Sequence, residues 1–142
     1  MQDDLFNHST AVKEPTKTVG DNYERVAAAF LETQGLSLVK KNYSVPRVGE
    51  IDIIAYQRKT LATGKSYETL ICVEVRARKH SQFSSAAETV TRAKQKRLIA
   101  TMQHFLMENA QYEHCDVRFD VLAFDILPTG VQYNWIQAAF LS

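Results

Sequence analysis

The sequence is poor in several features that would assign a protein to a class at once. It has 2 cysteines, 5 glycines and 3 prolines in 142 residues, and its formal net charge is only +1. So small a charge argues against a protein that coats nucleic acid through bulk electrostatics and leaves room only for a local basic patch. The sequence also contains no internal repeat and no Gly-rich phosphate-binding loop.

Long hydrophobic runs are missing as well. No run approaches the roughly 20 apolar residues of a membrane-spanning helix, and the first residues lack the basic and apolar regions of a signal peptide. We therefore expect a cytoplasmic protein with no membrane partner. Cys72 and Cys115 lie in strand-like runs without CxxC spacing, and the adjacent His114 has no useful ligand spacing. We expect reduced thiols and no structural zinc site.

The content of 45% hydrophobic and 23% charged residues is that of an ordinary soluble protein with one core. Residues 1–18 are polar, include Pro15 and show no periodicity, which predicts a flexible tail. Residues 19–142 then form a single domain.

The periodicity of the apolar residues predicts the order of helices and strands in this domain. Residues 20–34 have helical spacing and end at Gly35, and two strands at 36–45 and 49–55 form a hairpin. Later elements are a turn at 57–68, a strand at 70–78, a helix from a capping box at Ser85 to about residue 108 with a break near Thr91, a strand at 117–126, a short edge strand at 131–133 and a terminal helical turn at 135–141.

The helix between the strands at 70–78 and 117–126 predicts that these two strands are parallel. The fold class is therefore α/β, with a central mixed sheet of about five strands: helix, three-stranded antiparallel meander, helix, strand and edge strand. Three late aromatic residues are expected to cover the core and not to stack on bases. They are Tyr133, Trp135 and Phe140.

Charged side chains enter two of the apolar strands. Alternation places Ile51, Ile53 and Ala55 on one face of their strand and Asp52 on the other. In the strand at 70–78, Glu74 and Arg76 share a face. A solvent-facing Asp52 and an exposed Glu74–Arg76 pair are one interpretation, since surface ion pairs are common.

The second interpretation is chemical. Charged groups in apolar strands are costly unless they are paired or bind a metal. If Asp52 and Glu74 converge beside Arg76, they form a carboxylate site for a hard divalent cation next to a fixed positive charge, which is suited to cutting phosphodiesters. Glu24, at the border of the first helix's apolar stripe, could join them, or could simply favour the helix dipole.

Basic residues follow both of these regions. One group comes after the Glu74 strand and another opens the following helix, where a solvated helix face and a phosphate-binding patch are both open interpretations. The two groups are Arg76, Arg78, Lys79 and His80, and Arg92, Lys94, Lys96 and Arg97.

Taken together, these blocks resemble the YraN-like family of small bacterial proteins over residues 19–140. The blocks are the helix with Glu24, residues 49–52 (GEID), residues 73–76 (VEVR), residues 91–95 (TRAKQ) and residues 118–120 (RFD). The family is similar to nucleases of the PD-(D/E)xK superfamily, which includes restriction endonucleases and archaeal-type Holliday junction resolvases. The resemblance implies a restriction-endonuclease-like fold.

The resemblance also implies roles for individual residues. Glu24, Asp52 and Glu74 would bind Mg²⁺ or Mn²⁺, with the carbonyl of Val75 as a further ligand. The nearby Glu50 would be a supporting or alternative ligand. The residues that would face the substrate are Arg78, Arg92, Lys94 and Gln95.

Arg76 stands where such nucleases usually have a lysine. A guanidinium stays protonated and cannot take a proton from water, although it stabilises charge on a phosphate. The proton-accepting role would then pass to the substrate phosphate or to water activated by the metal.

Two functions therefore remain open. The first is a metal-dependent endonuclease acting on DNA, including branched DNA, for which a homodimer would supply one site for each strand. The second is a catalytically silent nucleic-acid-binding or protein-interaction module on the same fold. A plain α/β scaffold without a site is the third interpretation.

Overall fold

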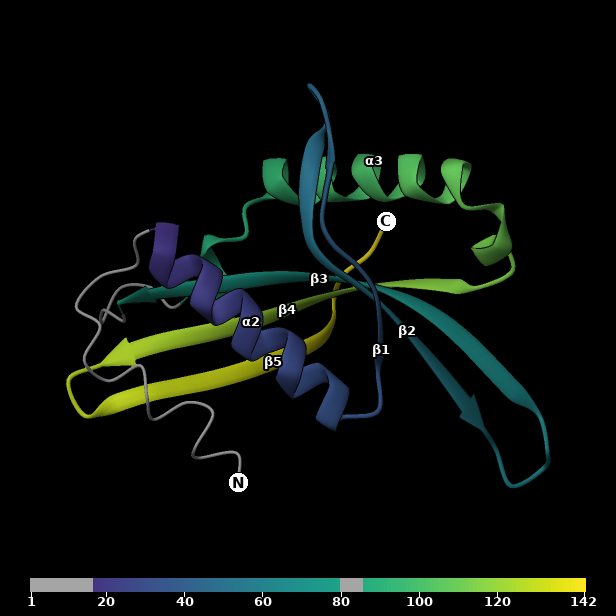
Figure 1. The fold of residues 1–142 in the computed structure, drawn as a ribbon, viewed down its shortest axis with the longest axis horizontal. Helices are drawn as coiled ribbons and strands as arrows, with labels where there is room; N and C mark the ends of the chain where they lie inside the picture. Colours follow the sequence, from purple (N-terminus) through teal and green to yellow (C-terminus); the bar gives the residue numbers. More distant parts are fainter. Residues whose placement is uncertain (1–16, 80–85) are drawn as a thin grey trace.

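A five-stranded mixed sheet lies between two helices in the computed structural model, which describes residues 17–79 and 86–142 (Figure 1). The strands lie in the order β1-β2-β3-β4-β5, with β3 and β4 parallel and the other neighbours antiparallel. This confirms the predicted α/β, restriction-endonuclease-like arrangement. The elements are α2 (Lys17–Thr33), β1 (Ser37–Val45), β2 (Gly49–Thr60), β3 (Ser66–Lys79), η1 (Ala87–Thr89), α3 (Arg92–Glu108), η2 (Ala110–Tyr112), β4 (Asp116–Leu127) and β5 (Gly130–Phe140).

The first helix ends as its sequence predicts. Gly35 adopts φ 88°, a left-handed conformation that costs glycine little. Its N–H donates to the Glu32 carbonyl, and the N–H of Leu36 donates to the Leu31 carbonyl, which together form a Schellman motif. Of the predicted tail, residues 1–16 lie outside the described residues, while α2 already begins at Lys17.

Each face of the sheet has its own apolar core. On one face, α2 contributes Tyr23, Phe30 and Leu31, which pack with Ile71 and other strand residues. On the opposite face, α3 packs through Leu98, Met102 and Phe105 against a second set of strand side chains. Tyr133 and Trp135 pack against the first core and Phe140 against the second, which confirms their predicted role as cover for the core.

The predicted alternation along β2 holds only in part. Ile53 and Ala55 face the α2 core as expected, but Ile51 packs with Ile54 in the α3 core. The prediction that Ile51 shares a face with Ile53 was wrong. The physical reason is that β2 pairs with β3 only as far as Ile53, opposite Val73, so the strand is free to turn at Asp52.

The second helix begins later than the capping-box pattern predicts. Ser85 lies outside the described residues, and residues 87–89 form a short 3₁₀ turn. The α-helix starts at Arg92, where the hydroxyl of Thr91 accepts a hydrogen bond from the N–H of Lys94 at 3.2 Å. The expected break near Thr91 is therefore confirmed, with Thr91 as the N-cap.

The predicted helical turn at 135–141 was wrong, because β5 runs as a strand to Phe140 and is longer than the edge strand expected at 131–133. A register shift between β4 and β5 lies between Phe119 and Val121, and Ala138 adopts φ 51°. This bulge interrupts the period of two. The spacing of the apolar residues at 135, 136, 139 and 140 therefore imitated a helix.

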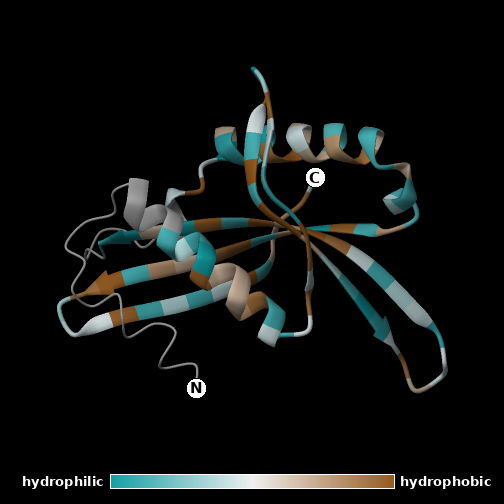
Figure 2. Ribbon diagram, in the orientation of Figure 1, coloured by the Kyte–Doolittle hydropathy of each residue, from teal (hydrophilic) through white to brown (hydrophobic). Residues whose placement is uncertain are grey.

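The sheet extends beyond its packed centre at one end. β2 continues to Thr60 and β3 begins at Ser66, so the connection between the two strands is shorter than the predicted turn at 57–68. Figure 2 shows that this end of the hairpin is mainly hydrophilic, in agreement with the exposure of residues 58–67. None of the helices in the described ranges is long and apolar enough to cross a membrane.

Candidate active site

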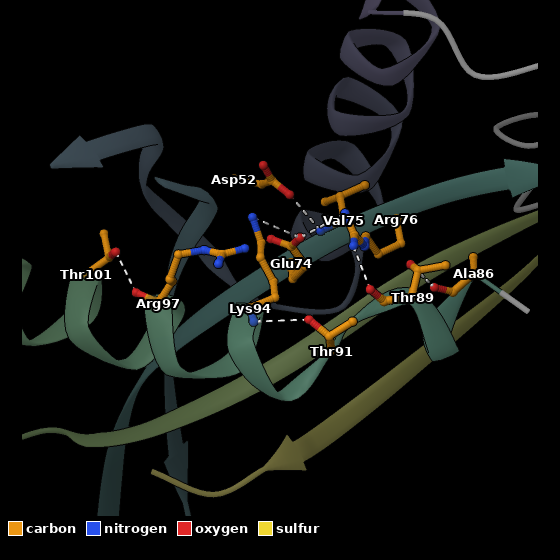
Figure 3. Close-up of polar contacts among 10 residues, drawn as sticks. All are labelled: Asp52, Glu74, Val75, Arg76, Ala86, Thr89, Thr91, Lys94, Arg97 and Thr101. Carbon is orange, nitrogen blue, oxygen red and sulfur yellow. Dashed lines mark hydrogen bonds and ion pairs between the residues drawn. The ribbon is translucent and has the colours of Figure 1, made fainter. Parts of the chain in front are cut away.

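Asp52 lies at the fork where β2 parts from β3. Its Oδ2 atom accepts a hydrogen bond of 2.9 Å from the backbone N–H of Val75 (Figure 3). The carboxylate thus accepts the hydrogen bond from the Val75 N–H that a backbone carbonyl of β2 would accept if the antiparallel pairing continued. In an extended strand the N–H and C=O of one residue face the same neighbour, so the Val75 carbonyl also faces this fork.

Glu74 is the acidic residue beside Asp52, and only 2% of its surface is exposed. Burial and then the charge of Asp52 raise the pKa of Glu74 to about 8, against the opposing effects of Lys94 and Arg76. Burial also raises the pKa of Asp52, although the hydrogen bond from Val75 lowers it. Two carboxyl groups are therefore held together where both cannot easily be ionised.

One oxygen of this pair has no partner to offset its burial. Oε1 of Glu74 is buried and has no hydrogen-bond partner among residues 17–79 and 86–142. A buried polar atom without a partner costs about 1–3 kcal/mol. Such an atom in a native structure calls for an explanation, and a catalytic role or a bound ion is among those known.

Lys94 brings a positive charge to the two carboxyl groups from α3. It lies in the first turn of α3, and its Nζ is 3.7 Å from Oε2 of Glu74. Figure 3 shows Lys94 and Glu74 pointing toward each other. The Thr91 cap fixes the start of this helix and so determines where Lys94 meets the strand.

Arg76 is anchored on the other side of Glu74. Its Nη1 is 3.5 Å from Oε2 of Glu74, and its Nη2 donates a 2.7 Å hydrogen bond to the carbonyl of Thr89 (Figure 3). Its Nε atom is buried and has no acceptor within the described part of the chain. The guanidinium is thus fixed beside the carboxylates while one donor stays unmatched.

A close approach of β2 to α3 brings these elements together. A Cβ atom added to Gly49 would lie 2.7 Å from Oγ1 of Thr101 and 3.4 Å from Cβ of Arg97. The Thr101 hydroxyl is itself buried and donates to the Arg97 carbonyl at 2.7 Å. Only glycine fits here without a shift of the Thr101 side chain or of the strand that leads to Asp52.

The structure brings Asp52, Glu74, Val75, Arg76 and Lys94 together. The remaining predicted positions lie around them. Glu24 is half-buried on α2, which covers the face opposite Glu74, so its approach to the carboxylates stays a prediction. The other positions are the exposed Glu50 and Arg92, the half-buried Arg78, and Gln95, whose amide donates to the Val90 carbonyl at 3.3 Å.

Two contacts of the site were missed by sequence reasoning. Thr89 takes part through its backbone carbonyl, and a carbonyl leaves no signal in the side-chain pattern. Lys94 was expected to face a substrate, whereas it forms an ion pair with Glu74. Its place three residues after Thr91, on the turn of the helix that follows the cap, is the signal that could have indicated this contact.

Comparison with known proteins gives a family but no activity. The model of the uncharacterised protein family UPF0102 matches residues 23–124. A UPF0102 protein of Psychrobacter sp. is 38% identical over 135 residues, covering 90% of this chain and 91% of the relative. Another, from Alcanivorax borkumensis, is 41% identical over 127 residues, covering 89% of this chain and 94% of the relative.

Some relatives are longer than this chain. A UPF0102 protein of Psychrobacter cryohalolentis is 40% identical over 113 residues, which are 80% of this chain but 63% of the relative. The chain therefore spans less than two thirds of that relative's length. The segment that the family model matches, residues 23–124, includes every residue of the site described above.

Proposed function

The chain belongs to the uncharacterised protein family UPF0102, which is the YraN-like family that its motifs resemble, and we propose that it is a metal-dependent endonuclease. The proposed reaction is the hydrolysis of phosphodiester bonds in DNA. One observation carries the proposal. Asp52 and Glu74 are held together at the fork of β2 and β3, and Oε1 of Glu74 is buried without a hydrogen-bond partner among the described residues.

The donor atoms fit a hard divalent cation. Asp52 and Glu74 offer carboxylate oxygens, and the Val75 carbonyl faces the same fork. Oxygen ligands of this kind suit Mg²⁺ or Mn²⁺. Glu24 is proposed as a further ligand on the strength of its place in the family motif. The bound cation would polarise the scissile phosphate and lower the pKa of an attacking water.

Arg76 and the basic residues around it are proposed to bind the negatively charged substrate. The guanidinium is held by the Thr89 carbonyl, and 31% of the Arg76 side chain is exposed, so its charge lies close to the solvent from which a phosphate would bind. Being permanently charged, it stabilises the charge that develops on the phosphate without taking up a proton. Arg78, Arg92 and Gln95 are proposed to contact the DNA backbone outside this centre.

Lys94 supplies the amine that position 76 lacks. Its Nζ lies 3.7 Å from Glu74, so the amine stands beside the proposed metal ligands (Figure 3). An ammonium, unlike a guanidinium, can exchange a proton during the reaction. In hydrolysis the water oxygen bonds to phosphorus, the bond to one sugar oxygen breaks, and that oxygen takes up a proton. The proton that the water loses would pass to the substrate phosphate or to solvent, and we assign the proton that the sugar oxygen takes up to the Lys94 ammonium, which is then protonated again from solvent.

The test is cleavage of labelled four-way junctions, flaps and linear DNA with Mg²⁺, with Mn²⁺ or with a chelator. Wild type is expected to cut at least one substrate only with metal, and Asp52→Asn is expected to bind the same DNA without cutting it. Preference for the four-way junction would favour a resolvase-like homodimer, because two strands must be cut. Cutting that persists in the chelator, or in folded Asp52→Asn, would contradict the proposal.

A catalytically silent DNA-binding module is the second function. Arg76 at the position of the usual lysine favours it. It predicts salt-sensitive binding that needs no metal and depends on the basic residues of α3. Replacing Arg92, Lys96 and Arg97 together by alanine should weaken such binding, and unchanged binding would count against this function.

A further inference from the structure

A second group of potential metal ligands lies at the other end of β3. Glu68 is the third residue of β3, and His114 and Cys115 directly precede β4. The parallel register pairs Thr69 with Asp116, so Glu68 and Cys115 are neighbours on adjoining strands. Glu68 is six residues from Glu74, or roughly 20 Å along an extended strand, so this group is separate from the candidate active site.

The three side chains present their donor atoms to one another. Sγ of Cys115 lies 4.0 Å from Oε2 of Glu68 and 3.8 Å from Nε2 of His114. Nε2 of His114 contacts Oε2 of Glu68 directly. All of these donor atoms lie within 4.8 Å of one another, and no other group of three such residues in the described ranges does so.

The spacing of sulfur and nitrogen is close to what a tetrahedral ion requires, whereas the direct contact between His114 and Glu68 would have to open to admit the ion. With bonds of about 2.3 Å to sulfur and about 2.0 Å to nitrogen, a tetrahedral zinc site holds these two atoms about 3.5 Å apart. The observed 3.8 Å therefore differs by only a few tenths of an ångström. Small rotations of partly exposed side chains are enough to remove that difference, since His114 is exposed and Glu68 and Cys115 are half-buried.

We propose that Glu68, His114 and Cys115 form a zinc site with three protein ligands and one position open to water. A thiolate, an imidazole and a carboxylate are the ligands that zinc takes in proteins. They differ from the all-oxygen set at Asp52 and Glu74, because Mg²⁺ does not favour sulfur or nitrogen. The bound ion would join the segment before β4 to the beginning of β3.

The sequence pattern alone had argued against zinc, and the reason for the difference is topological. His114 and Cys115 have no second pair of ligands nearby in the sequence. Glu68 precedes them by 46 and 47 positions and reaches them only through the parallel pairing of β3 with β4. A ligand contributed across a crossover connection does not follow any short spacing motif.

Cobalt provides the test, because Co²⁺ occupies zinc sites and its absorption reports a bound thiolate. The full chain is titrated with Co²⁺ in the presence of excess Mg²⁺, and Zn²⁺ is then added. The expected result is a thiolate-to-cobalt charge-transfer band that saturates at one ion per chain and is lost when zinc displaces the cobalt. Cys115→Ser should abolish the band, and His114→Ala and Glu68→Gln should each weaken binding by about tenfold or more, which corresponds to about 1.4 kcal/mol.

Two controls make the outcome decisive. Cys72→Ala removes the other cysteine, which is buried in the α3 core, and should leave the band unchanged. Zinc should also raise the melting temperature of wild type but not that of Cys115→Ser, because a ligand that binds only the folded state stabilises it. A wild type without the band, or a band that survives in Cys115→Ser, would overturn the proposal. Neither readout depends on nuclease activity.

Discussion

Nζ of Lys94 lies 3.7 Å from Oε2 of Glu74, and the guanidinium of Arg76 reaches the same oxygen atom at 3.5 Å. The two cations approach Glu74 from different elements, α3 and β3, and Arg76 is also tied to the backbone carbonyl of Thr89. In the proposed nuclease, the arrangement would divide the work of a single lysine between two residues. Arg76 would supply fixed charge, and Lys94 would supply an amine that can exchange a proton.

Replacing Lys94 by methionine should therefore abolish most cleavage while leaving DNA binding nearly unchanged. Loss of proton exchange costs about 10²-fold to 10⁴-fold in rate. Lys94→Arg keeps the charge but not the proton exchange, so it should also cut slowly. Single-turnover rates measured across pH test this, with the exposed Lys96→Met as the matched control. Wild-type rates and pH dependence in folded Lys94→Met would show that Lys94 has no such role.

Gly49 is predicted to be essential for the packing of β2 on α3. An alanine there would place its Cβ 2.7 Å from the Thr101 hydroxyl, so we expect Gly49→Ala to destabilise the protein by about 1–3 kcal/mol. Thr101→Ala removes the atom in conflict. Denaturant unfolding of both single variants and the double variant should show that the double variant loses less stability than the sum of the two. Strict additivity would mean that this contact does not limit the packing.

Two buried carboxylates are expected to respond in opposite ways to conversion into amides. Asp120 is 1% exposed and fully satisfied: it accepts hydrogen bonds from Arg118 at 2.8 Å and 2.9 Å, from the Trp135 indole at 3.0 Å and from the Ala138 N–H at 3.0 Å. Asp120→Asn breaks a buried ion pair and the support of the β5 bulge. We expect it to cost about 3–5 kcal/mol of unfolding free energy.

Glu74→Gln is the matched comparison, since Glu74 is 2% exposed but has an unmatched oxygen. Because its pKa is about 8, a neutral amide imitates the form that the metal-free protein holds at pH 7. At pH 7 the amide avoids the free-energy cost of protonating this group on folding, so Glu74→Gln is expected to be at least as stable as wild type and to differ from it least near pH 4.5. Urea unfolding of the two variants side by side measures this contrast, and equal losses would contradict the distinction between a structural and a functional carboxylate.

The raised pKa of Glu74 also predicts how the stability of the metal-free protein depends on pH. Burial and Asp52 raise this pKa from 4.5 to about 8, so the folded state binds more protons than the unfolded state between these values. The stabilising contribution of protonated Glu74 is complete below about pH 4.5 and is lost as the pH rises through 8. Wild type should therefore lose stability over this range relative to Glu74→Gln.

Unfolding curves recorded in chelator at several pH values between 5 and 8 check this. Glu32→Gln, at an exposed position on α2, serves as the control and should follow wild type. If the difference between wild type and Glu74→Gln stays constant across the range, the proton is not held at Glu74.

The local patterns of the sequence were enough to predict most of the fold. Helical spacing before Gly35, the hairpin of β1 and β2 and the crossover between β3 and β4 all depend on nearby residues, and all are confirmed. The errors come from long-range effects. The Asp120 carboxylate takes the Ala138 N–H and holds a bulge in β5, and the end of the β2–β3 ladder turns Ile51 to the other face.

The candidate site divides in the same way. Period-two alternation placed Glu74 and Arg76 on one face, and the structure confirms this. The fork that aims Asp52 at Val75 and the contact of Lys94 with Glu74 depend on how β2, β3 and α3 pack, which no single strand pattern contains. The role of Glu24 as a ligand stays a prediction for the same reason.

Cleavage of a labelled four-way DNA junction by wild type and by Glu74→Gln, with Mg²⁺ or with a chelator, tests the central claim most directly. We predict that wild type cuts with Mg²⁺ and not with the chelator, and that folded Glu74→Gln binds the junction without cutting it. Cutting of equal rate by the two proteins, or an absence of cutting by folded wild type on this and on flap and linear substrates, would contradict the assignment of Asp52 and Glu74 to a nuclease centre.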